Sequence, residues 1–126
     1  MNVLNKILII EDELNINKLI QHRLALEHYV VITAFDGEEG FAKFLVEHPD
    51  LIILDVNLPK INGYEVCRRI RREKNDMTPI LMLTSKNEDA DRIVGRVKGA
   101  DAYMSKPFDG EKLVAEVKLL LKKGRE

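Results

Sequence analysis

Five short apolar runs set the strongest constraint on what this chain can fold into. Within each run, apolar residues occupy successive positions and do not alternate with polar ones. A strand of that kind has to be covered on both faces, which is typical of a parallel sheet between two layers of helices. Strands are therefore predicted at residues 6–10, 30–34, 51–54 and 79–84 and, more weakly, at 102–105.

The segments between these runs carry apolar residues at helical spacing, such as Ile16, Ile20 and Leu24. Turn or capping residues precede four of the expected helices, at 36–37, 62–63, 85–87 and 109–110. The pattern predicts five βα units, hence an α/β fold with a doubly wound, five-stranded parallel sheet and five helices. A closed barrel would need eight such units.

Composition narrows the function classes. The 126 residues suit one domain, residues 1–126, and a net charge of -1 argues against a dominant role in nucleic-acid binding. Cys67 is the only cysteine, which excludes a disulfide framework. No apolar run of about 18 residues and no signal-peptide pattern occurs, so we expect a cytoplasmic protein that does not enter the membrane.

Acidic residues follow two of the predicted strands. Glu11 and Asp12 come directly after the first, and Asp55 follows the third. In an open parallel sheet, ligands bind beyond the carboxyl ends of the strands where the winding reverses, so these carboxylates are expected to converge. Because mutual repulsion disfavours three neighbouring carboxylates, the cluster predicts a divalent cation such as Mg²⁺.

Two further polar residues lie at the other strand ends. Thr84 ends the fourth strand and Lys106 follows the fifth, and together they offer the hydroxyl and the positive charge that stabilise a transferring phosphoryl group. Each feature alone has a plainer reading, because acidic residues often cap helices and threonine ends many strands. Their coincidence at four strand ends favours a site, with Asp55 as the nucleophile.

Four motifs at these positions identify a resemblance: KILIIEDE, DVNLPKINGYEV, LTS and GADAYMSKPF. In this order and spacing, the chain resembles a CheY-like receiver domain of a two-component response regulator over residues 6–122. The resemblance implies a flavodoxin-like fold with strand order 2-1-3-4-5.

The resemblance also implies roles for individual residues. Asp55 would be the phosphoacceptor, and Mg²⁺, with Mn²⁺ as an alternative, would be held by Glu11, Asp12, Asp55 and the backbone carbonyl of Asn57. The phosphate-binding and switch residues would be Thr84, Ser85, Lys106 and Tyr103. The Lys106–Pro107 peptide bond would be cis. Asn57 and Lys86 would tune dephosphorylation.

The same resemblance implies the partners. A sensor histidine kinase or a histidine phosphotransfer protein would donate the phosphoryl group, and the surface of helix four, strand five and helix five would report it. The chain would be no enzyme beyond its own phosphorylation and dephosphorylation, with no direct nucleic-acid binding by this domain. Output would come from a downstream protein or from an output domain outside this sequence. A stand-alone regulator and a receiver from a longer protein both remain open.

Some residues depart from the winged-helix transcription-factor branch of this family. Ala102 replaces an acidic residue, and Lys112 and Glu116 reverse the charges that build the symmetric dimer of that branch, although Arg92 fits its pattern. Our hypothesis is a different readout partner. A phosphorylation-dependent symmetric dimer through this face would contradict it.

Other classes fit less well. The acidic residues at 11–13 stand where a dinucleotide-binding or P-loop protein needs glycines. A small Mg²⁺-dependent phosphatase with an aspartyl-phosphate intermediate is the main alternative, but Asn57 stands where such an enzyme needs a second acid. A pure interaction module would leave the carboxylates unexplained.

Overall fold

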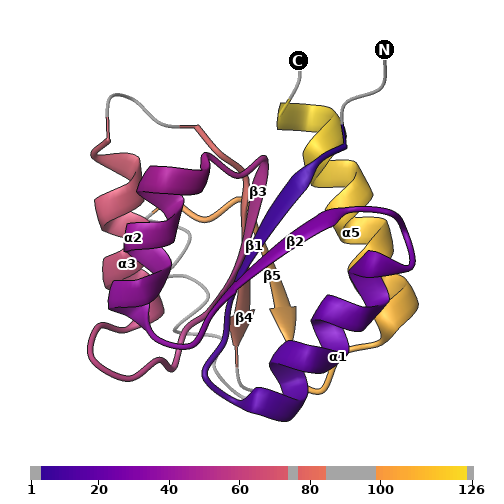
Figure 1. The fold of residues 1–126 in the computed structure, drawn as a ribbon, viewed down its shortest axis with the longest axis horizontal. Helices are drawn as coiled ribbons and strands as arrows, with labels where there is room; N and C mark the ends of the chain where they lie inside the picture. Colours follow the sequence, from indigo (N-terminus) through magenta and orange to yellow (C-terminus); the bar gives the residue numbers. More distant parts are fainter. Residues whose placement is uncertain (1–3, 74–76, 85–98, 125–126) are drawn as a thin grey trace.

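Strands and helices alternate along the chain (Figure 1). The computed structural model describes residues 4–73, 77–84 and 99–124. Its strands are β1 (Lys6–Ile10), β2 (Val30–Ala34), β3 (Leu51–Asp55), β4 (Ile80–Thr84) and β5 (Ala102–Ser105). Its helices are α1 (Leu14–Ala25), α2 (Gly37–Glu47), α3 (Gly63–Arg71) and α5 (Gly110–Gly124).

The five strands form one parallel sheet in the order β2-β1-β3-β4-β5, which confirms the predicted fold class. The winding reverses between β1 and β3, where Ile10 lies beside Leu54. Strand β3 is one residue longer than predicted, because Asp55 still pairs with Leu83 of β4. Four of the five expected helices are described. The remaining one, fourth along the chain, falls on residues 85–98, outside the described ranges.

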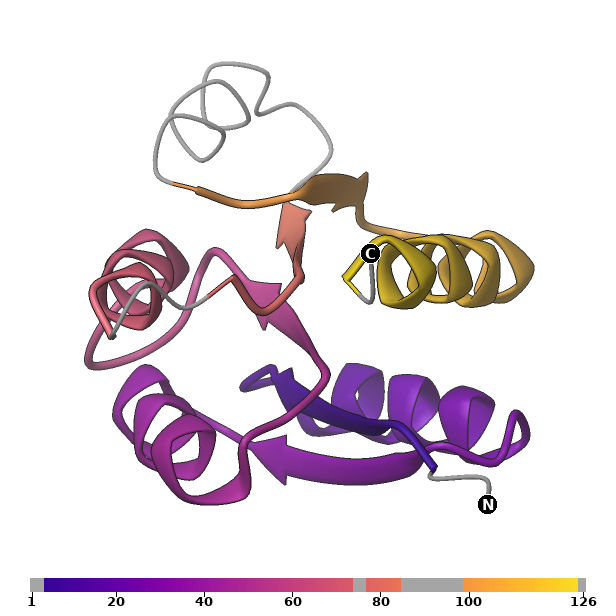
Figure 2. The same cartoon turned by 90° about the horizontal axis from the view of Figure 1, so that it is seen from above.

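Among the described helices, α1 and α5 cover one face of the sheet and α2 and α3 cover the other (Figure 2). Successive strand residues enter opposite cores: Ile7 and Ile9 pack in the cluster under α1 and α5, whereas Leu8 and Ile10 pack in the cluster under α2 and α3. Every residue of β3 and β4 is buried, as uninterrupted apolar strands require. None of the described helices is long and apolar enough to cross a membrane.

Side chains at the carboxyl edge of the sheet begin the helices. The side chain of Asp36 accepts a hydrogen bond from the Glu39 amide at 2.7 Å, and that of Asn62 accepts one from the Glu65 amide at 3.0 Å. These are the N-caps of α2 and α3, as predicted from the sequence. The cap expected at 85–87 lies outside the described residues.

Helix α3 separates a buried face from a charged one. Cys67 is fully buried in the core, which agrees with a structural thiol. On the outer face, Glu65 pairs with Arg68 at 2.6 Å and with Arg69 at 3.0 Å. The outer face of α3 therefore carries charged side chains that pair with one another.

Candidate functional site

Three carboxylates meet at the carboxyl edge of the sheet. Glu11 follows β1, Asp55 ends β3, and the two strands are neighbours, so the topology brings these residues and Asp12 together. One carboxylate oxygen from each of the three lies within 4.8 Å of the others. Glu11 and Asp55 are buried, with 0% and 3% exposure, whereas Asp12 is exposed. The cluster therefore consists of two carboxylates that are shielded from solvent and one that faces it.

Lys106 reaches this cluster from the loop after β5. Its Nζ lies 2.6 Å from Oε1 of Glu11 and 3.3 Å from Oδ2 of Asp55. Its amide donates to the carbonyl of Thr84 at 2.8 Å, and the Lys106–Pro107 bond is cis. The shorter ion pair is thus with Glu11, and Asp55 is the more weakly held of the two acids.

Burial governs the ionisation of these groups. Removal from water and the negative charge of Glu11 raise the pKa of Asp55 to about 7, even though Lys106 opposes the shift. Burial alone would lower the pKa of Lys106, but hydrogen bonding to Glu11 and the charges of both acids hold it above its ordinary value. Lys106 therefore stays positively charged. The positive charge near Asp55 is too small to offset its burial and the charge of Glu11, so Asp55 does not ionise easily.

The donor set fits a hard divalent cation. Mg²⁺ prefers carboxylate and carbonyl oxygens and retains several waters, which suits an exposed acid beside two buried ones. Among the described residues, three carboxylates lie beside one ammonium group, that of Lys106, so a cation would offset the repulsion that raises the pKa of Asp55. Asn57, predicted to offer its carbonyl, lies two residues after Asp55, and its amide donates to Oδ1 of Asp55 at 3.2 Å.

The residues predicted to bind a phosphoryl group surround this centre unevenly. Thr84 ends β4 and is fully buried, and its Oγ1 has no hydrogen-bond partner among the described residues. Tyr103 lies half-buried on β5 and packs against the core under α2 and α3. Ser105 lies beside Thr84 across the β4–β5 pair. Ser85 and Lys86 lie outside the described residues.

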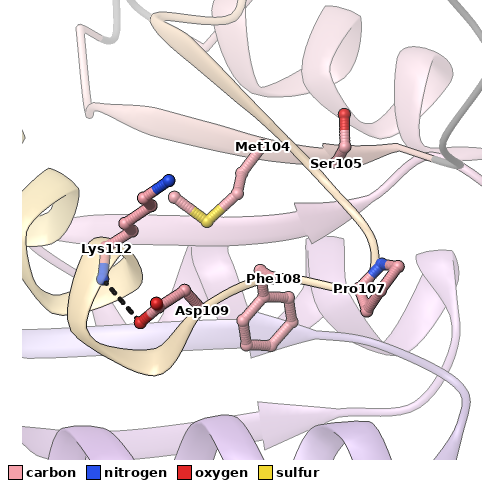
Figure 3. A pocket seen from close by; sticks show the side chains of 6 residues that line it. All are labelled: Met104, Ser105, Pro107, Phe108, Asp109 and Lys112. Carbon is pink, nitrogen blue, oxygen red and sulfur yellow. Dashed lines mark hydrogen bonds between the residues drawn. The ribbon is translucent and has the colours of Figure 1, made fainter.

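A pocket adjoins the loop that carries Lys106. Figure 3 shows its lining, and its volume is about 300 Å³. The amide of Lys112 donates to Oδ1 of Asp109 at 3.4 Å across its base, which fixes the first turn of α5. The lining residues are Met104, Ser105, Pro107, Phe108, Asp109 and Lys112.

Sequence reasoning missed two residues that support the site. Gly63 packs so closely on β3 that a Cβ there would lie 2.3 Å from the carbonyl oxygen of Asp55. Asn17 of α1 is fully buried, and its Nδ2 donates to the carbonyls of Glu11 at 3.0 Å and Ala34 at 3.4 Å. The signal for Asn17 was a polar residue on the apolar face of an otherwise amphipathic helix.

Comparisons with known proteins place this geometry in a family. The family model "Response regulator receiver domain" matches residues 7–118. The chain is 50% identical over 118 residues, 94% of its length and 49% of the relative, to the alkaline phosphatase synthesis transcriptional regulatory protein PhoP of Bacillus subtilis. It is 43% identical over 120 residues, 95% of its length and 54% of the relative, to the response regulator ArlR of Staphylococcus aureus.

Solved structures agree with these sequence matches. A putative response regulator from Chloroflexus aurantiacus aligns with a TM-score of 0.92 and 35% identity, over 95% of this chain and 99% of that one. The chemotaxis response regulator CheY4 of Vibrio cholerae aligns with a TM-score of 0.88 and 34% identity, over 94% of this chain and 99% of that one. The chain spans about half the length of the curated relatives it matches. It belongs to the family of receiver domains of two-component response regulators.

Proposed function

We propose that this receiver domain is a switch that accepts a phosphoryl group on Asp55 from a histidine kinase or a histidine phosphotransfer protein. The observation that carries the proposal is the position of Asp55. It ends β3 beside Glu11, Asp12 and Lys106. Membership of the receiver family supports a phosphohistidine donor.

In the proposed transfer, an Oδ of Asp55 attacks the phosphorus atom, a new O–P bond forms, and the N–P bond to the donor histidine breaks with its electron pair returning to the imidazole. Lys106 stabilises the negative charge on the phosphoryl oxygens, and the buried floor limits competition from water. Mg²⁺, held by Asp12, Asp55, the Asn57 carbonyl and Glu11, would supply the positive charge that lets Asp55 ionise and two anions approach.

The residues around Asp55 suggest how phosphorylation changes the molecule. The added dianion competes with Glu11 for Lys106, and it offers acceptor oxygens to the buried hydroxyl of Thr84, which has no hydrogen-bond partner among the described residues. Tyr103 then repacks on β5, and the surface of β5, α5 and the helix expected at 85–98 changes for a partner or an output domain. The chain in this account modifies and restores only itself and turns over no external substrate.

Intact-mass spectrometry with Mg²⁺ and acetyl phosphate tests the proposal. We expect one labile phosphoryl group on the wild-type chain and none on Asp55→Asn or after chelation of the metal. Continuous hydrolysis of the donor without a stable adduct would instead indicate the phosphatase alternative. A wild-type chain that gains no mass from acetyl phosphate or from a phosphorylated kinase would refute the proposal.

A further inference from the structure

Asn17 joins the ends of two strands beside the acidic pocket. It lies in the first turns of α1, which begins at the carboxyl edge of the sheet (Figure 1). Its Nδ2 donates to the carbonyl of Glu11, just beyond β1, and to the carbonyl of Ala34, the last residue of β2. The Ala34 carbonyl also accepts from the Glu11 amide at 3.1 Å. Asn17 therefore bonds directly to the Glu11 carbonyl, and it shares the Ala34 carbonyl with the Glu11 amide.

Asparagine is an unfavourable choice for this position on stability grounds. It is a poor helix former, and here its Oδ1 is buried without a hydrogen-bond partner among the described residues. A neighbouring buried position of the same helix, Ile20, carries an aliphatic side chain that packs in the core. The stability cost points to a role for the two donors of the amide.

The sheet itself does not need these donors. The β1–β2 ladder is already paired through Ile10 and Ala34, and β1 pairs with β3 on its other side. What Asn17 adds is restraint of the Glu11 carbonyl, where the chain leaves the sheet and turns toward Asp12. The Oε2 of Glu11 accepts from the Glu13 amide at 3.0 Å, so the restrained residue is also the centre of this turn.

We infer that Asn17 is a positioning residue for the cation site, acting by fixing the turn that carries Glu11 and Asp12. This inference rests on the proposed Mg²⁺ site. Hydrogen-bond partners that orient metal ligands contribute strongly to metal affinity, because a mobile ligand must become ordered when the metal binds. Loss of the amide should therefore reduce the magnitude of the free energy of cation binding by more than it lowers the free energy of unfolding.

The test compares Asn17→Leu, which keeps the approximate shape but removes both donors, with Ile20→Val, which loosens the packing of the same helix without removing a hydrogen-bond donor. Calorimetric titration of the whole chain with Mg²⁺, without any phosphoryl donor, gives the dissociation constant, and urea unfolding of each variant gives its stability. We expect the dissociation constant of Asn17→Leu to rise about tenfold and that of Ile20→Val to stay within about twofold of wild type.

Two results would overturn the inference: Mg²⁺ binding by Asn17→Leu as tight as by the wild type, or an equal loss of affinity in Ile20→Val. If Asn17→Leu does not fold, Asn17→Ser replaces it, with a rise of about threefold or more expected because one short donor remains. A wild-type chain that binds no Mg²⁺ would instead refute the cation site of the proposed function, and the inference with it.

Discussion

At the scale of single residues, the ionisation of Asp55 is the property that most needs explanation. Burial and Glu11 push its pKa to about 7, and Lys106 only partly compensates because its closer partner is Glu11. A nucleophilic carboxylate has to be ionised. An additional positive charge beside Asp55, such as a bound cation, would favour the ionised form. Without a cation, Asp55, the proposed phosphoacceptor, is therefore largely protonated below pH 7.

This predicts a pH-dependent gain in stability for Asp55→Asn. The folded pKa of about 7 lies above the ordinary value of 3.8, so the folded state retains a proton that the unfolded state loses. The wild type therefore loses stability as the pH rises from about 4 to 7, whereas the neutral asparagine does not. We expect the advantage of Asp55→Asn in free energy of unfolding to grow by about 2 kcal/mol between pH 5 and pH 8.

Urea unfolding of both chains across this pH range, with a chelator present, measures that difference. Saturating Mg²⁺ should close the gap, because it stabilises only the wild-type pocket. A gap that stays constant with pH would show that burial does not control the charge of Asp55.

At the scale of elements, the close packing of α3 against β3 fixes the position of Asp55, the proposed phosphoacceptor. The amide of Gly63 donates to the Val56 carbonyl at 2.8 Å, and its Cα faces the backbone of Asp55 without room for a side chain. The helix therefore starts directly behind the residue that ends the strand. Position of the acceptor and start of the helix cannot change independently.

Substitution of Gly63 by alanine tests this coupling. The added Cβ would lie 2.3 Å from the Asp55 carbonyl oxygen, so either α3 or the end of β3 must shift. We expect Gly63→Ala to lower the free energy of unfolding by about 2–3 kcal/mol and to slow phosphorylation by acetyl phosphate. Gly110→Ala is the matched control, because its Cβ would meet nothing closer than Arg23 Nε at 3.4 Å. A stability change for Gly63→Ala no larger than for Gly110→Ala would contradict the coupling.

Sequence patterns predicted elements better than the contacts between them. The five strands were predictable because uninterrupted apolar runs must be buried on both faces, and the caps Asp36 and Asn62 because their side chains bond locally. The role of Asn17 was not, because its bonds depend on how α1 lies over the ends of β1 and β2. Nor could the sequence tell that Lys106 lies closer to Glu11 than to Asp55.

At the scale of the whole molecule, the two edges of the sheet differ in character. At the carboxyl edge lie three neighbouring carboxylates and the buried hydroxyl of Thr84, for which the described part of the chain offers no hydrogen-bond partner. At the amino edge, Arg71 donates to the carbonyls of Thr78 and Gly99 and to Asp101, 30 residues further along the chain. Asp101 in turn accepts from the Ile80 amide. Hydrogen bonds thus hold the amino edge together. At the carboxyl edge, the carboxylates and the Thr84 hydroxyl can rearrange around a charged ligand.

This division predicts that the Arg71 contacts stabilise the fold without contributing to the chemistry. We expect Arg71→Met to lower the free energy of unfolding by about 2 kcal/mol, because the carbonyls of Thr78 and Gly99 and the carboxylate of Asp101 each lose the hydrogen bond from Arg71. Arg69→Met, which breaks only the half-exposed pair with Glu65, should change it by less than about 0.5 kcal/mol. The rate of phosphorylation by acetyl phosphate, measured where both variants are fully folded, should remain that of the wild type. A slowed rate in Arg71→Met alone would contradict the division.

The central claim, that Asp55 forms an acyl phosphate with the help of a divalent cation, can be tested by chemical trapping. Borohydride reduces an aspartyl phosphate to homoserine with release of phosphate, and the tryptic peptide 44–60 carries position 55. After treatment with acetyl phosphate and Mg²⁺, peptide sequencing by mass spectrometry should find homoserine at position 55 and nowhere else. It should find none when the metal is chelated. Homoserine at position 12, or at no position in the chain, would contradict the account.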